Sequence, residues 1–198
     1  MMQPKQDRSR LTRQRLLEAT IECLAERGWP ATTVGVVAAR VGVSRGAAQH
    51  HFPTREDLIT AALEHMFAQL TEHVTAAAPT ARPPATDAER TEAVVSRVVE
   101  MYASLEFKAA LQVWTAAAAD PVLRARILPL EAKFGRGAHH MVVRHLGVDD
   151  RDPRVRGLVQ ATLDMARGLG LADVLHDDSK RRDQIVAVWS AVLNRALH

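Results

Sequence analysis

The chain has 198 residues, of which 47% are hydrophobic and 25% are charged, and its formal net charge is +3. This length and composition are typical of a soluble globular protein with one medium-sized domain or two small ones. The sequence has no run of about 18 apolar residues and no apolar signal segment at its start, so we expect a cytoplasmic protein that neither spans a membrane nor is secreted.

The positive charge is concentrated near the N-terminus. Residues 1–55 contain nine Lys and Arg against four Asp and Glu, whereas the remaining 143 residues contain 17 against 19. Clustered cations that face a polyanion release its counterions, which provides the sequence-independent part of DNA affinity. A solvated basic surface is the alternative explanation, so the charge points to DNA only together with a binding motif.

The first predicted helix ends near Gly28. Its apolar stripe recurs at helical spacing and consists of Leu16, Leu17, Thr20, Ile21 and Leu24. Cys23 lies on the same helix and is the only cysteine, which excludes an intramolecular disulfide and agrees with a reducing compartment. We expect its side chain to be a small buried hydrophobe rather than a redox sensor.

Residues 32–58 have the pattern of two short helices joined by a tight turn, with the helices expected at 33–40 and 44–50. Thr32 or Thr33 can cap the first helix, and apolar residues at positions 34, 37, 38 and 41 form one face. Gly42 follows where a left-handed backbone is often needed, and Ser44 can cap the second helix. This is the pattern of a helix-turn-helix, whose second helix enters the DNA major groove, although proteins that bind no DNA also use it.

Helices are predicted throughout the rest of the chain. Pro53 ends the second helix of the pair, and Thr54 caps a long connecting helix. A loop is expected at 78–85, because its three prolines disfavour a helix. Further helices are predicted around residues 94–105, 111–118, 121–146, 154–175 and 181–197, the third of them bent near Pro129 or the Gly135 and Gly137 pair. The pattern contains no strand-like alternation, so we predict an all-α fold.

The order of these motifs resembles that of the TetR family of bacterial transcription regulators. The matching run extends from Thr12 to Ala62 and includes the segments RLLEAT, ERGW, TTV, VAARVGVSRGA and HHFPTREDL. The resemblance implies a helix-turn-helix DNA-binding domain at 1–55 with three helices, and a helical ligand-binding and dimerisation domain at 56–198. One difference from the family pattern is Gln49, where the family usually has an aromatic residue.

The predicted DNA contacts lie on and around the second helix of the pair. Arg45 is the best candidate for base recognition, since a guanidinium can pair bidentately with guanine O6 and N7. His51 is predicted to contact a phosphate. Phe52 is expected to pack in the core of the predicted DNA-binding domain at 1–55, called the head below. Side-chain chemistry and the resemblance together give the following set: Thr33, Ser44, Arg45, Gly46, Ala47, Gln49, His50, His51, Thr54 and Arg55.

The resemblance also implies a small-molecule pocket and a dimer interface in the C-terminal two thirds. The candidate ligand contacts are the large side chains of this region, although such residues are more often plain core: Met66, Phe67, Leu70, Met101, Tyr102, Trp114, Phe134 and Met165. Tyr102 and Trp114 are preferred because each has a polar atom that can orient a ligand. Charged residues are scarce in this set, so we expect an apolar effector. The last two helices are expected to form the homodimer interface.

The favoured function is a homodimeric, ligand-responsive regulator that acts as a repressor on a palindromic, double-stranded DNA operator. An activator or global regulator with the same fold is the first alternative, and a helical adaptor or enzyme without DNA binding is the second. No catalytic motif is present, and we expect no cofactor and no metal. His139, His140 and His145 lack the spacing and the acidic or Cys partners that a metal site needs.

Overall fold

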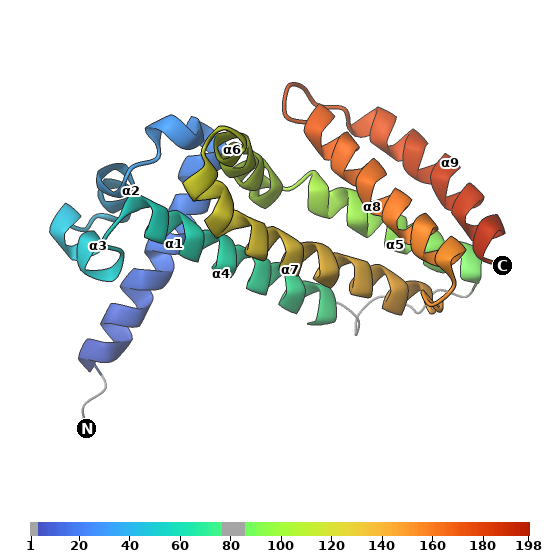
Figure 1. Cartoon of the computed structure of the whole chain (residues 1–198), viewed down its shortest axis with the longest axis horizontal. Coiled ribbons are helices and arrows are strands. Elements are labelled where there is room, and N and C mark those ends of the chain that lie inside the picture. Colours follow the sequence, from blue (N-terminus) through green and yellow to red (C-terminus); the bar gives the residue numbers. More distant parts are fainter. Residues whose placement is uncertain (1–3, 77–85) are drawn as a thin grey trace. The chain divides into compact units, whose positions relative to one another are not determined.

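The computed structural model describes residues 4–76 and 86–198, and side chains at 7–69 and 86–198. This part of the chain contains nine α-helices and no strand, which confirms the all-α prediction. The loop predicted at 78–85 lies outside the described residues. The helices are α1 (Pro4–Ala31), α2 (Val34–Val41), α3 (Arg45–His51), α4 (Arg55–Ala76), α5 (Asp87–Tyr102), α6 (Leu105–Ala119), α7 (Pro121–Leu146), α8 (Pro153–Ala172) and α9 (Ser179–Leu197) (Figure 1).

The chain divides into two compact units. The first contains the residues up to Leu70 together with Lys108–Glu131, and the second contains Thr71–Phe107 together with Ala132–His198. The first unit therefore combines α1, α2, α3 and most of α4 with parts of α6 and α7. None of the helices in the described residues is both long and apolar enough to cross a membrane.

The buried stripe predicted for α1 is confirmed, because Leu16, Leu17, Ile21 and Leu24 are all buried, together with Cys23. The helix begins at Pro4, earlier than its apolar pattern indicates. Gly28 has a φ of 75° and interrupts the helical geometry where the sequence predicts the end of the helix. A positive φ strongly favours glycine, so Gly28 sets the point at which α1 stops being regular.

The turn between α2 and α3 has the predicted geometry. Gly42 has a φ of 75° and a ψ of 31°, the left-handed conformation that closes a helix end. The Thr33 hydroxyl accepts a hydrogen bond from the Val36 amide at 3.2 Å, and the Ser44 hydroxyl accepts one from the Ala47 amide at 3.1 Å. Both caps satisfy amide groups that a helix cannot pair internally. The start of each helix is therefore fixed by a local hydrogen bond.

Ion pairs join the helices of the first unit. Arg40 at the end of α2 reaches Glu26 of α1 at 2.6 Å, and this hydrogen bond lowers the pKa of Glu26. Arg126 of α7 pairs with Asp57 of α4 at 3.0 Å. Pro129 lies inside α7, which continues through it as one helix from Pro121 to Leu146. The first turns of α7 are thus tied to the start of α4.

In the second unit, α5 packs against α8 and α9. The helices α8 and α9 lie side by side in Figure 1 and are joined by a short loop. The Trp189 indole of α9 donates to the Thr162 hydroxyl of α8 at 3.0 Å. The close approach of α8 to the end of α5 depends on Gly170, since a methyl group there would overlap the carbonyl oxygen of Tyr102 and lie 2.9 Å from Cε1 of Phe107.

Replacing Gly170 with alanine should therefore destabilise the protein by about 1–3 kcal/mol or more, because backbone atoms must move to admit the methyl group. The measurement is the unfolding midpoint in heat or urea. Gly137→Ala is the matched control: it also adds a methyl group inside a helix, but with no atom within 4 Å of the new carbon. We expect that control to be neutral or stabilising by about 0.5–1 kcal/mol. Equal midpoints for the two variants would show that the close approach of α8 to α5 is unimportant.

Candidate functional site

Helix α3 exposes nearly all of its side chains. Ala48 is buried and anchors the helix, and His51 is half-buried. The remaining positions are exposed: Arg45, Gly46, Ala47, Gln49 and His50. A helix that is attached through one small residue can insert the rest of its surface into a groove. The B-DNA major groove is about 12 Å wide and admits an α-helix.

The N-terminal end of α3 carries the residue best suited to read a base. Arg45 is the first residue of the helix, directly after the Ser44 cap, and its side chain is exposed. In helix-turn-helix proteins the N-terminal residues of the recognition helix contact base edges. Arg45 is thus exposed at the end of α3 where such a contact is expected, and the contact itself stays a prediction.

At the C-terminal end of α3, Arg13 and His51 lie next to the Phe52 ring, and His50 lies next to His51. The His50 and His51 rings have centroids 5.7 Å apart, and the Arg13 guanidinium of α1 lies 5.1 Å from the centroid of the Phe52 ring. Phe52 is buried, as expected. Burial of the His51 imidazole is the main cause that lowers its pKa, and the charges of His50 and Arg13 lower it further. The imidazole of His51 can donate an N–H to a phosphate in either protonation state.

Two predicted contacts are helix caps. The hydroxyls of Thr33 and Thr54 accept hydrogen bonds from the first turns of α2 and α4, and both side chains are exposed. Helix starts of this kind present free amide groups, which commonly hold phosphates of the DNA backbone. The two threonines therefore act mainly by ordering the helix ends that a phosphate would meet.

Arg55 has a structural partner that the sequence did not reveal. Its guanidinium lies 4.1 Å from the centroid of the Trp29 ring and donates a hydrogen bond to the Trp29 carbonyl. Burial lowers the pKa of Arg55. These contacts hold the end of α1 against the start of α4. A phosphate contact by Arg55 stays a prediction, and it would compete with this anchoring role.

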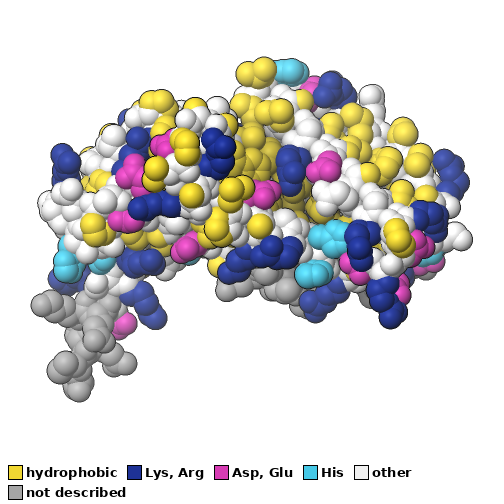
Figure 2. All heavy atoms as spheres, viewed as in Figure 1, with side chains coloured by type: hydrophobic (Ala, Val, Ile, Leu, Met, Phe, Trp, Pro, Cys, Tyr) yellow, Lys and Arg dark blue, Asp and Glu magenta, His cyan; other side chains and the backbone are white. Residues whose placement is uncertain are grey.

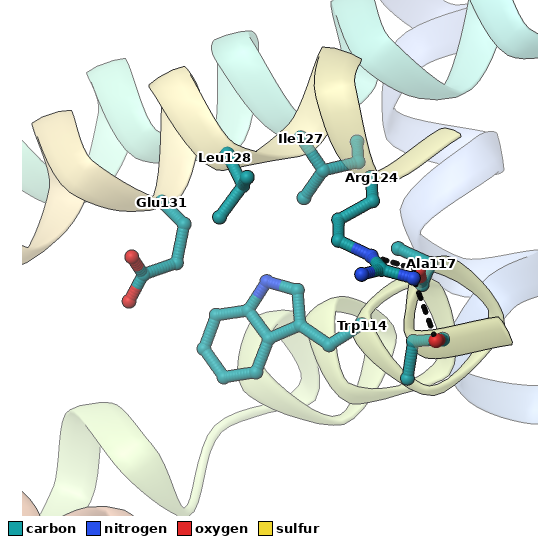
Figure 3. A pocket seen from close by; sticks show the side chains of 7 residues that line it. Trp114, Ala117, Arg124, Ile127, Leu128 and Glu131 are labelled. Carbon is teal, nitrogen blue, oxygen red and sulfur yellow. Dashed lines mark hydrogen bonds between the residues drawn. The ribbon is translucent and has the colours of Figure 1, made fainter. Parts of the chain in front are cut away.

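The first unit also contains an open cavity of about 200 Å³ between α6 and α7 (Figure 3). The Trp114 ring of α6 faces Leu128 of α7, and the Arg124 guanidinium closes one end by donating to the carbonyls of Ala117 and Ala118 at 3.2 and 3.1 Å. The lining is otherwise apolar apart from one carboxylate and consists of Trp114, Ala117, Ala118, Arg124, Ile127, Leu128 and Glu131.

Trp114 is the residue that the predicted ligand set shares with this cavity. Met66, Phe67 and Tyr102 are buried in the cores of their units, and Met101, Phe134 and Met165 are half-buried. Tyr102 is 1% exposed, and its ring stacks edge-on against Phe107 and Phe134 at 5.0 and 6.4 Å. The Leu70 side chain lies outside the described residues. In this structure, therefore, Tyr102 is a core residue.

The residues of α7 that line the cavity were not among the predicted ligand contacts. Its members at positions 124, 127, 128 and 131 recur at helical spacing, which was the available signal. That signal was hidden because the apolar stripe of α7 at positions 123, 127, 130 and 134 overlaps it.

Among the described residues no group of three His, Cys, Asp or Glu could hold a metal. His139 is paired with Asp150 at 3.1 Å.

Comparison with known proteins agrees with this geometry. Residues 16–62 match the model of the family "Bacterial regulatory proteins, tetR family". The HTH-type transcriptional regulator CymR of Pseudomonas putida is 26% identical over 193 residues, which cover 93% of this chain and 92% of CymR. The HTH-type transcriptional regulator BetI of Burkholderia mallei is 30% identical over 125 residues, or 61% of this chain and 62% of BetI.

Solved structures show the same fold. A TetR-family regulator of Rhodococcus sp. superposes with a TM-score of 0.68 at 17% identity, over 92% of this chain and 98% of that one. The multidrug binding protein EbrR, in complex with imidazole, has a TM-score of 0.59 at 25% identity over 94% of each chain. With its capped helix-turn-helix and its helical C-terminal region, the chain is similar along most of its length to bacterial transcriptional regulators of the TetR family, and residues 16–62 match the model of that family itself.

Proposed function

We propose that this regulator binds a palindromic operator as a homodimer, acts as a cytoplasmic repressor, and releases DNA when a compact apolar effector binds. The observation that carries the DNA-binding part is α3, which exposes Arg45, Gln49 and His50 while Ala48 holds it to the head. Regulators of this family are DNA-binding proteins and commonly repressors. An activator would use the same surface, and the two are distinguished by transcription from the neighbouring promoter.

Arg45→Ala should weaken binding to the native operator by about 1–3 kcal/mol and relax the preference at one base pair in each half-site. The reason is the removal of a bidentate guanine contact, which carries sequence information. The measurement is a mobility-shift or anisotropy titration against operators substituted at each position. Arg27→Ala removes an exposed arginine of α1 and serves as the control, with unchanged preference expected. Full retention of the preference by Arg45→Ala would contradict the assignment of Arg45.

The dimer proposal rests on the outer faces of α8 and α9, where small and apolar residues are exposed. Leu171 is 59% exposed, Val188 is 67% exposed and Val192 is 38% exposed. Gly157, Ala161 and Gly168 lie exposed at helical spacing on α8. Apolar surface of this kind on two adjacent helices gains free energy when it is buried against a second copy, and small residues permit close packing. A four-helix interface satisfies both helices at once.

Charging this face should therefore separate the protomers. The double variant Val188→Glu/Val192→Glu is expected to sediment as a monomer at micromolar concentration while the wild type is a dimer, because two buried carboxylates would face their own symmetry mates. Val122→Glu, at a 72% exposed position of α7, is the control and should stay dimeric. If wild type and double variant have the same mass, the interface lies elsewhere.

The cavity between α6 and α7 is the proposed effector site. A cavity of about 150 Å³ lined by apolar side chains accepts benzene, so a space of about 200 Å³ suits a compact molecule of about one ring. The cavity belongs to the same compact unit as α2 and α3. One wall, α7, is tied to α4 by the Arg126–Asp57 pair, and the other, α6, brings Gln112 close to Gly28. A ligand that favours a different spacing of α6 and α7 would thus bias the helices that hold α3.

Trp114→Ala should reduce the effector response by about tenfold or more, since removing the indole takes away the largest apolar surface of the cavity, and each 1.4 kcal/mol of binding free energy is about tenfold in affinity. The assay is a panel of neutral monocyclic, charged and phosphorylated compounds, scored for release of operator DNA and for thermal stabilisation. Met165→Ala is the matched control, because it truncates a half-buried residue of the second unit. If only multiply charged compounds act, or if Met165→Ala rather than Trp114→Ala removes the response, the effector site is not this cavity.

A further inference from the structure

The first half of α1 contributes no buried side chain to the core between Asp7 and Arg15. Every side chain from Asp7 to Arg15 is exposed except Thr12, which is half-buried, and the first buried residue is Leu16. Nine helical residues rise about 13 Å, so about two and a half turns of α1 carry exposed side chains before the helix enters the core. This stretch contains four arginines against one carboxylate. A solvated helix this basic is suited to meet an anion.

Helical spacing determines which neighbours these arginines face. Arg13 lies one turn before Leu17 on the face of α1 that packs in the head, and its guanidinium stacks on Phe52 at the end of α3. Arg10 lies one further turn out, where its side chain is 85% exposed and pairs with the exposed Asp7 at 3.7 Å. Arg13 thus places a cation of α1 beside the end of the recognition helix, and Arg10 follows one turn away from it. Figure 2 shows the dark blue of Lys and Arg and the cyan of His together at the lower left, where Figure 1 places α3 and the first half of α1.

Arg8 and Arg15 form a second row of arginines on α1, on the face that contacts the end of α2. Arg15 donates to the carbonyl of Val41, the last residue of α2, at 2.8 Å. Arg8 lies two helical turns before Arg15, hence close to the same face, and it is exposed. The start of α1 therefore presents Arg8 and Arg10 on the faces that lead to α2 and α3. Both residues lie too far out to contribute to the core of the head.

We propose that the first turns of α1 form a second DNA contact, in which Arg8 and Arg10 bind phosphodiester groups of the duplex flanking each half-site. The proposal rests on the proposed function, since it needs α3 in the major groove. When a recognition helix occupies that groove, the neighbouring elements cross the phosphate backbone. Such contacts position the protein and add affinity but carry no base information. The operator complex then extends beyond the base pairs that α3 reads.

The test uses the double variant Arg8→Gln/Arg10→Gln of the full chain, with two duplexes. One ends at the edges of the two half-sites, and the other adds about 10 base pairs on each side. Wild type should bind the longer duplex more tightly, and the double variant should bind both equally. The slope of log affinity against log salt should become shallower by about 0.9 for each phosphate that an arginine no longer neutralises, with both heads of the dimer included. Preference among operator sequences should not change.

The matched control is Arg136→Gln/Arg144→Gln, which removes two exposed arginines of the second unit and should keep the wild-type salt slope. The proposal is overturned if Arg8→Gln/Arg10→Gln retains the wild-type slope and length dependence, or if it alters base preference. Arg45→Ala distinguishes this proposal from the proposed function. If Arg45→Ala changes sequence preference while the α1 variant changes nothing, the regulator reads DNA without this second contact. If neither variant affects binding, the proposed function itself is wrong.

Discussion

The geometry of the DNA-binding surface depends on the left-handed turn at Gly42. With a φ of 75°, this residue ends α2 and directs the chain into α3 within three residues. A side chain at that position would cost free energy because L-residues disfavour the conformation. The Ser44 cap then starts α3 at a defined residue. Ala48 is the buried residue of α3, and its small side chain allows the helix to lie close to the head while most of the other residues of α3 face outward. The exposure of Arg45 and Gln49 follows from this one constraint.

The arginines of the first unit divide into two groups according to their surroundings. Arg40 and Arg126 form ion pairs between helices, and Arg55 stacks on Trp29. Those guanidinium groups hold the head together, and using them on DNA would cost the contacts they already make. By contrast, Arg10 pairs with Asp7 of its own helix at 3.7 Å, and Arg8 and Arg45 are exposed near the starts of α1 and α3. The excess positive charge of residues 1–55 is counted after subtraction of Glu22 and Glu26, the two carboxylates that pair with Arg40. The remainder is available for phosphates.

The cavity between α6 and α7 gains its significance from the helices that border it. Arg124 of α7 donates to the carbonyls of Ala117 and Ala118 near the end of α6, so the two helices are joined close to the turn between them. The space between them is walled by Trp114 and Leu128, and the same helices touch α1 and α4 in the first unit. Coupling of a small molecule to DNA affinity requires that the ligand bind two arrangements of the protein with different affinities. As the proposed effector site, a cavity within the unit that carries α3 would provide that coupling over a short chain of contacts.

Local chemistry explains why so much of the head could be predicted from the sequence. The caps at Thr33 and Ser44, the glycine at position 42 and the apolar stripe of α1 act between residues that are close in the chain, so their geometry is encoded where it occurs. The exposure of Arg45 on α3 follows from the same pattern. Residue type and helical spacing predict the ligand set, but they do not show that Tyr102 is buried among aromatic rings while Trp114 borders a cavity. Likewise, nothing near Arg55 in the sequence identifies Trp29 as its partner, 26 residues away. Which large side chain fills a core and which lines a cavity depends on contacts between distant helices, and only the folded chain fixes those.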